Sequence, residues 1–228
     1  MKNILQIILI TFFTFTISSC AKKDDSTTAA ATTAAAGNIA GTGTTASGTI
    51  TGNDNLTGVF HTSYYGQEPS GGCVDNTTAI QYFSFPAETL GFKKQIIITS
   101  TSTFTESTVT YSDATCSTIT SYFNTMSKTV TIGSELTGLT AGSSPTKPTT
   151  ANKISYLRDK YALMANTTDM IAHFLSTYGV QLDSGTELAV EESSTSTIYN
   201  LIATETVAGS KFLFYDTARQ TDNFTDWS

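Results

Sequence analysis

The fold is indicated most clearly by one stretch, Lys94-Gln95-Ile96-Ile97-Ile98-Thr99-Ser100-Thr101-Ser102-Thr103-Phe104. Successive side chains of a β-strand point to opposite faces, so Ile96, Ile98 and Phe104 share one face. The opposite face carries Thr99, Thr101, Thr103 and Thr105. This alternation predicts a strand with one buried face, and we interpret the threonine row as its solvent face.

The flanking sequence is dominated by Thr, Ser, Tyr, Phe, Ile and Val, which favour strands, with turn residues at short intervals. Further strands are predicted at 56–64, 78–85, 107–111, 119–126, 128–136, 154–165, 187–190, 197–206 and 211–215. Segments 119–126 and 128–136 are expected to form a hairpin, whereas 154–165 also fits helical spacing. Loops are predicted at 67–76 and 142–150. The sequence therefore predicts a single mainly β domain over residues 49–228.

One helix is predicted, from about Thr168 to Tyr178. Its apolar stripe consists of Met170, Ile171, Phe174, Leu175 and Tyr178. Thr167 or Thr168 suits the N-cap, and Gly179 suits a left-handed C-cap.

The chain begins with a segment typical of protein export. Residues 4–17 are almost all Ile, Leu, Phe and Thr; this segment is too short to span a membrane stably and has the length of a signal-peptide core. The Ala-, Thr-, Gly- and Ser-rich residues 21–48 cannot bury enough apolar surface to fold, so we expect a flexible tether. Between the two lies Ile17-Ser18-Ser19-Cys20, which resembles the lipobox of bacterial lipoproteins.

The lipobox resemblance implies cleavage after a signal peptide at 1–19 and lipidation of Cys20. The protein would then be held at a membrane of the bacterial cell envelope, with residues 20–48 as lipidated tether. Ala21 follows the cysteine, which by the same resemblance favours the outer membrane. The alternative is an ordinary cleaved signal followed by a chance cysteine.

Two cysteines remain once Cys20 carries lipid, namely Cys73 and Cys116. A pair of cysteines in an exported domain indicates a disulfide, although two buried thiols or a metal site are alternatives. Closing a loop of about 44 residues would stabilise the fold by roughly 4 kcal/mol on the chain-entropy model.

The charge of the chain argues against nucleic-acid binding. The formal net charge is −7, which becomes −8 once Lys2 leaves with the signal peptide. Nucleic-acid binding needs a basic footprint, and the only neighbouring basic residues are the pairs Lys22-Lys23 and Lys93-Lys94.

Three short patterns resemble small bacterial lipoproteins with a lipocalin-like or calycin-like barrel. Gly58-Val59-Phe60 stands where lipocalins carry Gly-x-Trp, with Phe60 in place of the tryptophan. The segment 111–116 is similar to their Tyr-x-Asp-x-x-Cys turn. Residues 198–201 and 212–214, with Arg219 beyond them, resemble the closing hairpin. The resemblance implies an antiparallel barrel of about eight strands with one helix; a β-sandwich is the alternative.

No pattern of residues indicates catalysis. The two histidines, His61 and His173, lie in neither a nucleophile elbow nor a metal-binding spacing. Glu191 and Glu192 are neighbours on a predicted strand and point to opposite faces. The turn-like Asn53-Asp54-Asn55 lacks the further ligands of a calcium loop. We therefore expect no enzyme activity, no metal site and no cofactor.

Aromatic residues occupy many predicted strand positions, and they either fill a core or line a ligand cavity. The proposed ligand-binding residues are Phe60, Tyr82, Phe104 and Tyr122. The sequence thus favours a membrane-tethered binding module for a small hydrophobic ligand or an envelope component. The alternative is a surface-exposed structural or adhesive lipoprotein that binds macromolecules through the loops at 67–76 and 142–150.

Overall fold

The computed structural model describes residues 50–52, 56, 58–62, 72–75, 77–140, 147–192, 195–207, 210–215 and 219–227. Several predictions on the sequence lie outside these residues: the signal peptide at 1–19, the lipidated Cys20 with the tether to residue 48, the turn at 53–55, and most of the loops at 67–76 and 142–150.

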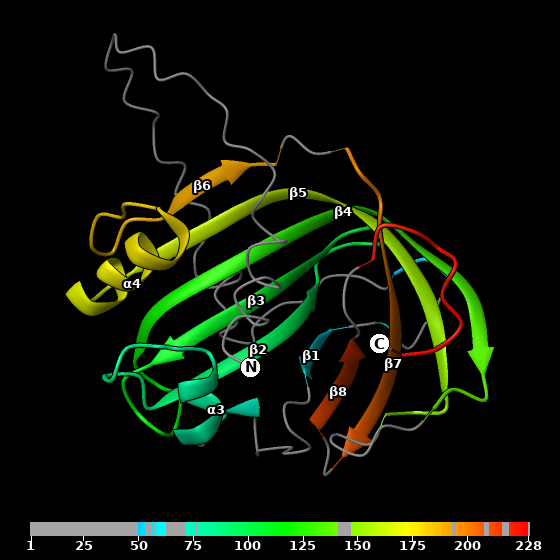
Figure 1. The fold of residues 1–228 in the computed structure, drawn as a ribbon, viewed down its shortest axis with the longest axis horizontal. Helices are drawn as coiled ribbons and strands as arrows, with labels where there is room; N and C mark the ends of the chain where they lie inside the picture. The colour runs from blue at the N-terminus through cyan, green and yellow to red at the C-terminus, as the bar shows by residue number, and fades with distance from the viewer. Residues whose placement is uncertain are drawn as a thin grey trace, which may run out of the picture. The chain divides into compact units, whose positions relative to one another are not determined.

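The described chain is mainly β, as predicted, and its sheet forms a nearly closed barrel rather than a sandwich (Figure 1). The strands are β1 Val59–Thr62, β2 Gly91–Ile98, β3 Phe104–Tyr111, β4 Ile119–Thr137, β5 Thr150–Ala165, β6 Leu188–Glu191, β7 Ile198–Val207 and β8 Ser210–Tyr215. The helices are α3 Thr77–Tyr82 and α4 Thr168–Tyr178. None of the described helices is long and apolar enough to cross a membrane.

The ring closes because β5 pairs on both of its edges. One edge pairs with β4 along almost its whole length. The other pairs with β7 at Asn152–Tyr156 and with β6 at Lys160–Leu163. Strands β6 and β7 are thus two halves of one interrupted strand, and the described ring runs β1-β2-β3-β4-β5-β6/β7-β8.

The closing pair of the ring is parallel, whereas every other strand pair is antiparallel. An up-and-down ring alternates strand direction at each step. With β6 and β7 counted as one strand the number is odd, so the first and last strands must run the same way. His61 therefore pairs with Phe212 and Thr62 with Leu213 in a parallel register.

Helix α4 has the predicted bounds and caps. The Thr167 side chain accepts a hydrogen bond from the backbone of Met170, and Gly179 adopts the left-handed conformation that ends the helix. Met170 and Phe174 are buried against Leu163 and Ala165 of β5. Strand 154–165 is also confirmed, as part of β5.

The predicted strand at 78–85 is wrong, because this segment contains α3. Val74 already pairs with Phe92 at the edge of β2, so the residues that follow do not need to extend the sheet there. Ile80 and Phe83 lie three residues apart, a helical spacing, and both pack on Phe92. Ser84 then adopts a positive φ of 57° and ends the segment.

The predicted hairpin at 119–136 is also wrong, since β4 is one long strand with register shifts against β5. Thr129 adopts a positive φ of 55° close to the expected bend, but it lies within the register shift between Lys128 and Thr131, and β4 continues past it along β5. Buried Ser127 accepts a hydrogen bond from the Phe104 amide and donates one to the Phe104 carbonyl, at 3.1 and 2.9 Å. This contact holds β4 beside β3 where a turn was expected.

The threonine row was not the solvent face of a strand, because β2 ends at Ile98. The hydroxyls of Thr99 and Ser100 each lie within hydrogen-bonding distance of the Thr103 hydroxyl, at 2.6 and 2.7 Å. Short hydroxyl side chains compete with the strand ladder in this way and favour turns. Thr105 lies in β3 and is buried.

Candidate functional site

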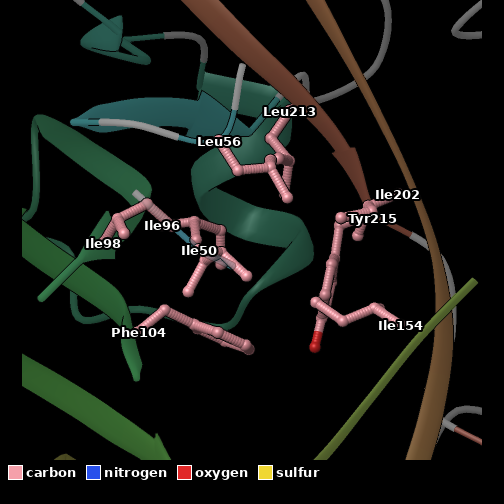
Figure 2. Close-up of a pocket in the computed structure, with 9 residues that line it drawn as sticks. All are labelled: Ile50, Leu56, Ile96, Ile98, Phe104, Ile154, Ile202, Leu213 and Tyr215. Atoms are coloured by element: carbon pink, nitrogen blue, oxygen red, sulfur yellow. The ribbon is translucent and has the colours of Figure 1, made fainter. Parts of the chain in front are cut away.

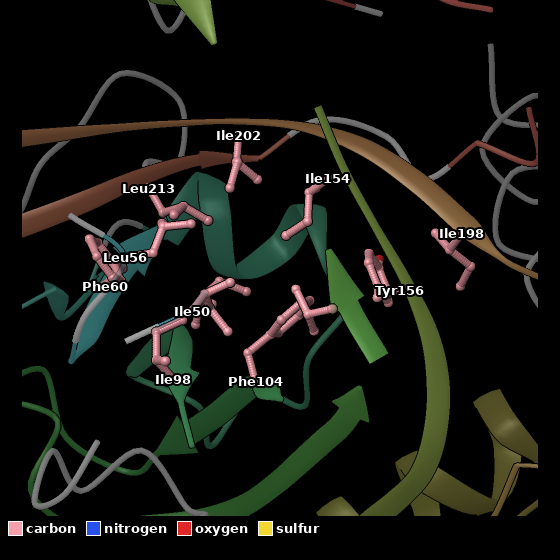
Figure 3. Close-up of a cluster of buried hydrophobic side chains, with 12 residues drawn as sticks. Ile50, Leu56, Phe60, Ile98, Phe104, Ile154, Tyr156, Ile198, Ile202 and Leu213 are labelled. Atoms are coloured by element: carbon pink, nitrogen blue, oxygen red, sulfur yellow. The ribbon is translucent and has the colours of Figure 1, made fainter. Parts of the chain in front are cut away.

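The interior of the barrel is the candidate functional site, and its first part is an apolar cluster. All seven strands of the ring, together with Ile50 and Leu56, contribute side chains to it (Figure 3). We call this cluster the apolar floor; its members include Phe60, Ile96, Ile98, Phe104, Val130, Ile154, Tyr156, Ile198, Ile202 and Leu213.

A small cavity lies in the apolar floor, lined by eight aliphatic or aromatic side chains and Tyr215 (Figure 2). The space open to the centre of a water-sized sphere is about 10 Å³, which is close to the minimum for a single water molecule. A hydrophobic ligand therefore does not fit in this cavity unless the surrounding side chains move.

The structure brings two of the four proposed ligand-binding residues together. Phe60 and Phe104 both belong to the apolar floor, and Phe104 lines the cavity. Tyr122 is buried in a different cluster with Val109, Tyr111 and Cys116, and its hydroxyl donates to Glu187. Tyr82 lies on α3 with 46% of its surface exposed. These four side chains therefore do not line one shared cavity.

A set of polar side chains borders the apolar floor and shares Tyr156 with it. The hydroxyls of Tyr156 and Tyr215 are hydrogen-bonded to each other, and the side chain of buried Asn200 bonds to both. Burial raises the pKa of both tyrosines above the ordinary value, and the negative charge of Glu106 raises it further. These phenols therefore stay protonated and act as hydrogen-bond donors at neutral pH.

The polar set continues along β5 through Arg158 and Tyr161. Arg158 donates to the Tyr161 hydroxyl at 3.0 Å, and that hydroxyl donates to Glu192 at 2.8 Å. Glu106 acts electrostatically on Arg158 as well as on Tyr156. We call these residues the polar layer: Glu106, Tyr156, Arg158, Tyr161, Glu192, Asn200 and Tyr215.

The strand registers place the polar layer on the inward face of the sheet. Residues directly opposite each other on paired strands share a face. Asn200 is opposite Ile154 and Tyr215 is opposite Ile202, so both polar residues lie on the same face as the apolar floor. Glu106 stands opposite Ile96 in the same way. Glu106, Arg158 and Tyr161 are only partly buried. The polar layer therefore offers charges and donors to a molecule that reaches this part of the interior.

Beyond the polar layer lie aromatic rings that pack against α4. Phe123 stacks on Tyr161, with ring centroids 5.8 Å apart, and contacts Tyr178 at 5.7 Å. His173 of α4 contacts Phe85 at 6.1 Å, and its burial lowers the pKa of the imidazole. Because it is surrounded by rings, His173 has the environment of a packing residue.

The predicted disulfide between Cys73 and Cys116 is present, with Cα atoms 5.8 Å apart. The adjoining turn is organised by Asp113, whose carboxylate accepts hydrogen bonds from the backbone and hydroxyl of Thr115 and Ser117 and from the backbone of Thr118. These bonds, led by that from the Thr115 side chain, lower the pKa of Asp113. The turn is thus a structural unit that holds Cys116 at a positive φ of 53°.

The polar layer was not predicted from the sequence. The sequence feature that could have indicated it is in β5, where the large polar residues Tyr156, Arg158 and Tyr161 lie in a strand that also supplies core side chains. Among the described residues, no group of three or more His, Cys, Asp or Glu side chains is placed to hold a metal ion. No protein-family model matches the chain, and no curated protein matches it significantly.

Proposed function

We propose that this chain is a lipid-anchored lipoprotein of the bacterial cell envelope, most consistent with the outer membrane, and that its barrel is a binding module without catalytic activity. The anchor is supported by the sequence Ile17-Ser18-Ser19-Cys20 after an apolar segment. Anchoring at Cys20 through more than one acyl chain would be stable, whereas a single chain binds a bilayer only marginally.

The observation that carries the binding role is the polar layer inside the barrel. Small-molecule sites are mostly apolar, with a few polar groups that fix the orientation of the ligand. Here Arg158, Glu106 and the tyrosine hydroxyls supply the polar groups, and Phe123 and Tyr178 supply apolar surface. The cavity in the apolar floor is too small for such a molecule, so we propose a small hydrophobic ligand with a polar end, bound where the polar layer meets the rings beside α4.

The first test is native mass spectrometry of the full mature chain, followed by organic extraction of bound molecules. We expect a co-purifying lipid-like molecule that Arg158→Gln reduces at least tenfold. Lys128→Gln is the matched control, because Lys128 pairs with Asp159 on the surface. An empty wild-type protein, or equal loss in both variants, would contradict the ligand-binding role.

The anchor is tested separately. Mass spectrometry of the mature N-terminus is expected to find acyl chains on Cys20, and Cys20→Ser is expected to release the protein from the membrane fraction. A Cys20→Ser protein that stays membrane-bound would exclude lipidation at this residue as the anchor. Because this result does not depend on the barrel interior, the two parts of the proposal fail independently.

A second candidate function is the binding of macromolecules through the exterior of the barrel. One specific observation favours it: within the part of the chain that the structure describes, one edge of β6 is unpaired, and exposed apolar side chains flank it.

A further inference from the structure

Strand β6 occupies an unusual position in the ring. It pairs with β5, and within the described part of the chain no strand pairs with its other edge (Figure 1). Its continuation, β7, is covered on that edge by β8, which ends opposite Ile202. Arg219 adds one bridge to Tyr199, after which the chain departs from this edge. Among the described residues, the edge of β6 therefore stays open where that of β7 is closed.

The hydrogen bonds of β6 show which backbone groups face outward. The Glu192 amide donates to the Asp159 carbonyl of β5 at 2.9 Å. In a strand the N–H and C=O groups of one residue point to the same side, and those of the next residue point to the opposite side. The backbone groups of Val190 and Leu188 therefore face β5, and those of Ala189 and Glu191 face the open edge.

The side chains beside this edge have a defined chemistry. Leu188 and Val190 are 37% and 43% exposed, and they lie on the face shared with Leu163 and Tyr161. The opposite face carries exposed Glu191, with Lys160 directly across on β5. An added strand would thus meet apolar side chains on one face and a carboxylate on the other.

We propose that the open edge of β6 accepts an extended segment of a partner polypeptide in which apolar residues alternate with lysine or arginine. Outward backbone groups at Ala189 and Glu191 would extend the sheet, as in other cases of strand addition. The basic residues would face Glu191 and the apolar residues would cover Leu188 and Val190. This site is the edge of β6, whereas the ligand proposed above lies inside the barrel; the apolar face of β6 is the one that also carries Leu163 and Tyr161.

Charge favours a basic partner over a second copy of this chain. Two β6 edges paired antiparallel would bring Glu191 and Glu192 of both copies together, and the chain as a whole has a net charge of −7. Charged residues on edge strands commonly prevent such self-pairing. Glu191, on the face opposite Leu188 and Val190, attracts a cationic segment, whereas Glu192 accepts the hydrogen bond from Tyr161.

The test uses the full chain and a fluorescent ten-residue peptide that alternates Val with Lys, with binding measured by anisotropy. We expect Ala189→Pro to weaken binding at least tenfold, because proline removes an outward N–H without removing a bond to β5. Ala189→Ser is the matched control and is expected to bind within twofold of the wild type. A peptide that alternates Val with Glu is expected not to bind.

A second measurement keeps the proposal testable if Ala189→Pro does not fold. Two peptides are compared, one N-methylated at the odd-numbered residues and the other at the even-numbered residues. Only one of these sets of N–H groups faces β6, so we expect one peptide to lose binding and the other to keep it. Equal effects of both sets, or equal binding of the lysine and glutamate peptides, would overturn the proposal. A concentration-dependent dimer of the wild type that Ala189→Pro abolishes would overturn it in favour of a second copy.

Discussion

At the scale of single residues, the disulfide and its neighbouring turn depend on close contacts. Gly91 at the start of β2 pairs with Tyr111 and lies directly beside the disulfide. Asp113 fixes the turn that presents Cys116. Gly91 leaves the space that the disulfide occupies, and Asp113 accepts the hydrogen bonds that the residues of the turn donate.

Gly91→Ala is expected to destabilise the oxidised protein by about 1–3 kcal/mol. A Cβ at this position would lie 2.8 Å from the Asp113 carbonyl oxygen and 2.9 Å from the Cys116 Sγ atom. Urea unfolding under non-reducing conditions measures the loss. Gly133→Ala is the control, because its nearest neighbour is a lysine side-chain atom at 3.2 Å, and an equal loss there would contradict the explanation.

The turn at Asp113 predicts a pH dependence of stability. Its folded-state pKa is lower than the unfolded value of about 3.9, so the ionised form stabilises the fold. This contribution is fully present above the unfolded pKa and is lost as the pH falls through the lower folded pKa. Asp113→Ala should therefore lower the urea midpoint at pH 7, with a difference from wild type that shrinks towards pH 2.

The control for Asp113 is Asp183→Ala, which removes an exposed carboxylate outside this turn. We expect little change in its urea midpoint at either pH. A difference between wild type and Asp113→Ala that stays constant from pH 7 to pH 2 would show that the carboxylate charge is not responsible.

At the scale of elements, local signals predicted α4 and β5 but not α3 or β4. Helix α4 carries its caps in its own sequence, at Thr167 and Gly179. In contrast, α3 forms because Val74 has taken the edge of β2, a long-range contact that no local pattern contains. The polar layer was missed for a similar reason: a register shift beside Arg158 sets which side chains of β5 face inward, and the sequence does not reveal that shift.

Thr167→Ala is expected to cost about 1 kcal/mol of unfolding free energy, the usual value for loss of an N-cap. The hydroxyl accepts from the Met170 amide at 3.3 Å and also donates to Glu88. Thermal and urea unfolding measure the effect. Thr167→Ser retains the hydroxyl and should stay near wild type; if serine and alanine are equally destabilised, the cap is not the cause.

At the scale of the whole molecule, the disulfide joins segments far apart in the sequence. Cys73 precedes α3 and Cys116 follows β3, at a sequence separation of 43. The bond therefore ties the edge of β2 to the turn that leads into β4. It limits the freedom of the unfolded chain more than a short-range bridge would.

Removing the disulfide is expected to cost roughly 4 kcal/mol on the chain-entropy model. The double variant Cys73→Ser, Cys116→Ser should unfold at lower urea concentration than the oxidised wild type. A reducing agent should lower the wild-type midpoint and leave that of the double variant unchanged. A wild-type midpoint that is insensitive to reduction would contradict this role.

The parallel closing pair has a consequence for mechanical force. When a chain is pulled from its two ends, neighbouring terminal strands that run in the same direction slide past each other, so their hydrogen bonds carry the load together. Antiparallel terminal strands would instead open one bond at a time. Strands β1 and β8 are parallel. We therefore expect the seam of this barrel to resist tension applied between the chain before β1 and the chain after β8 by shear rather than by unzipping.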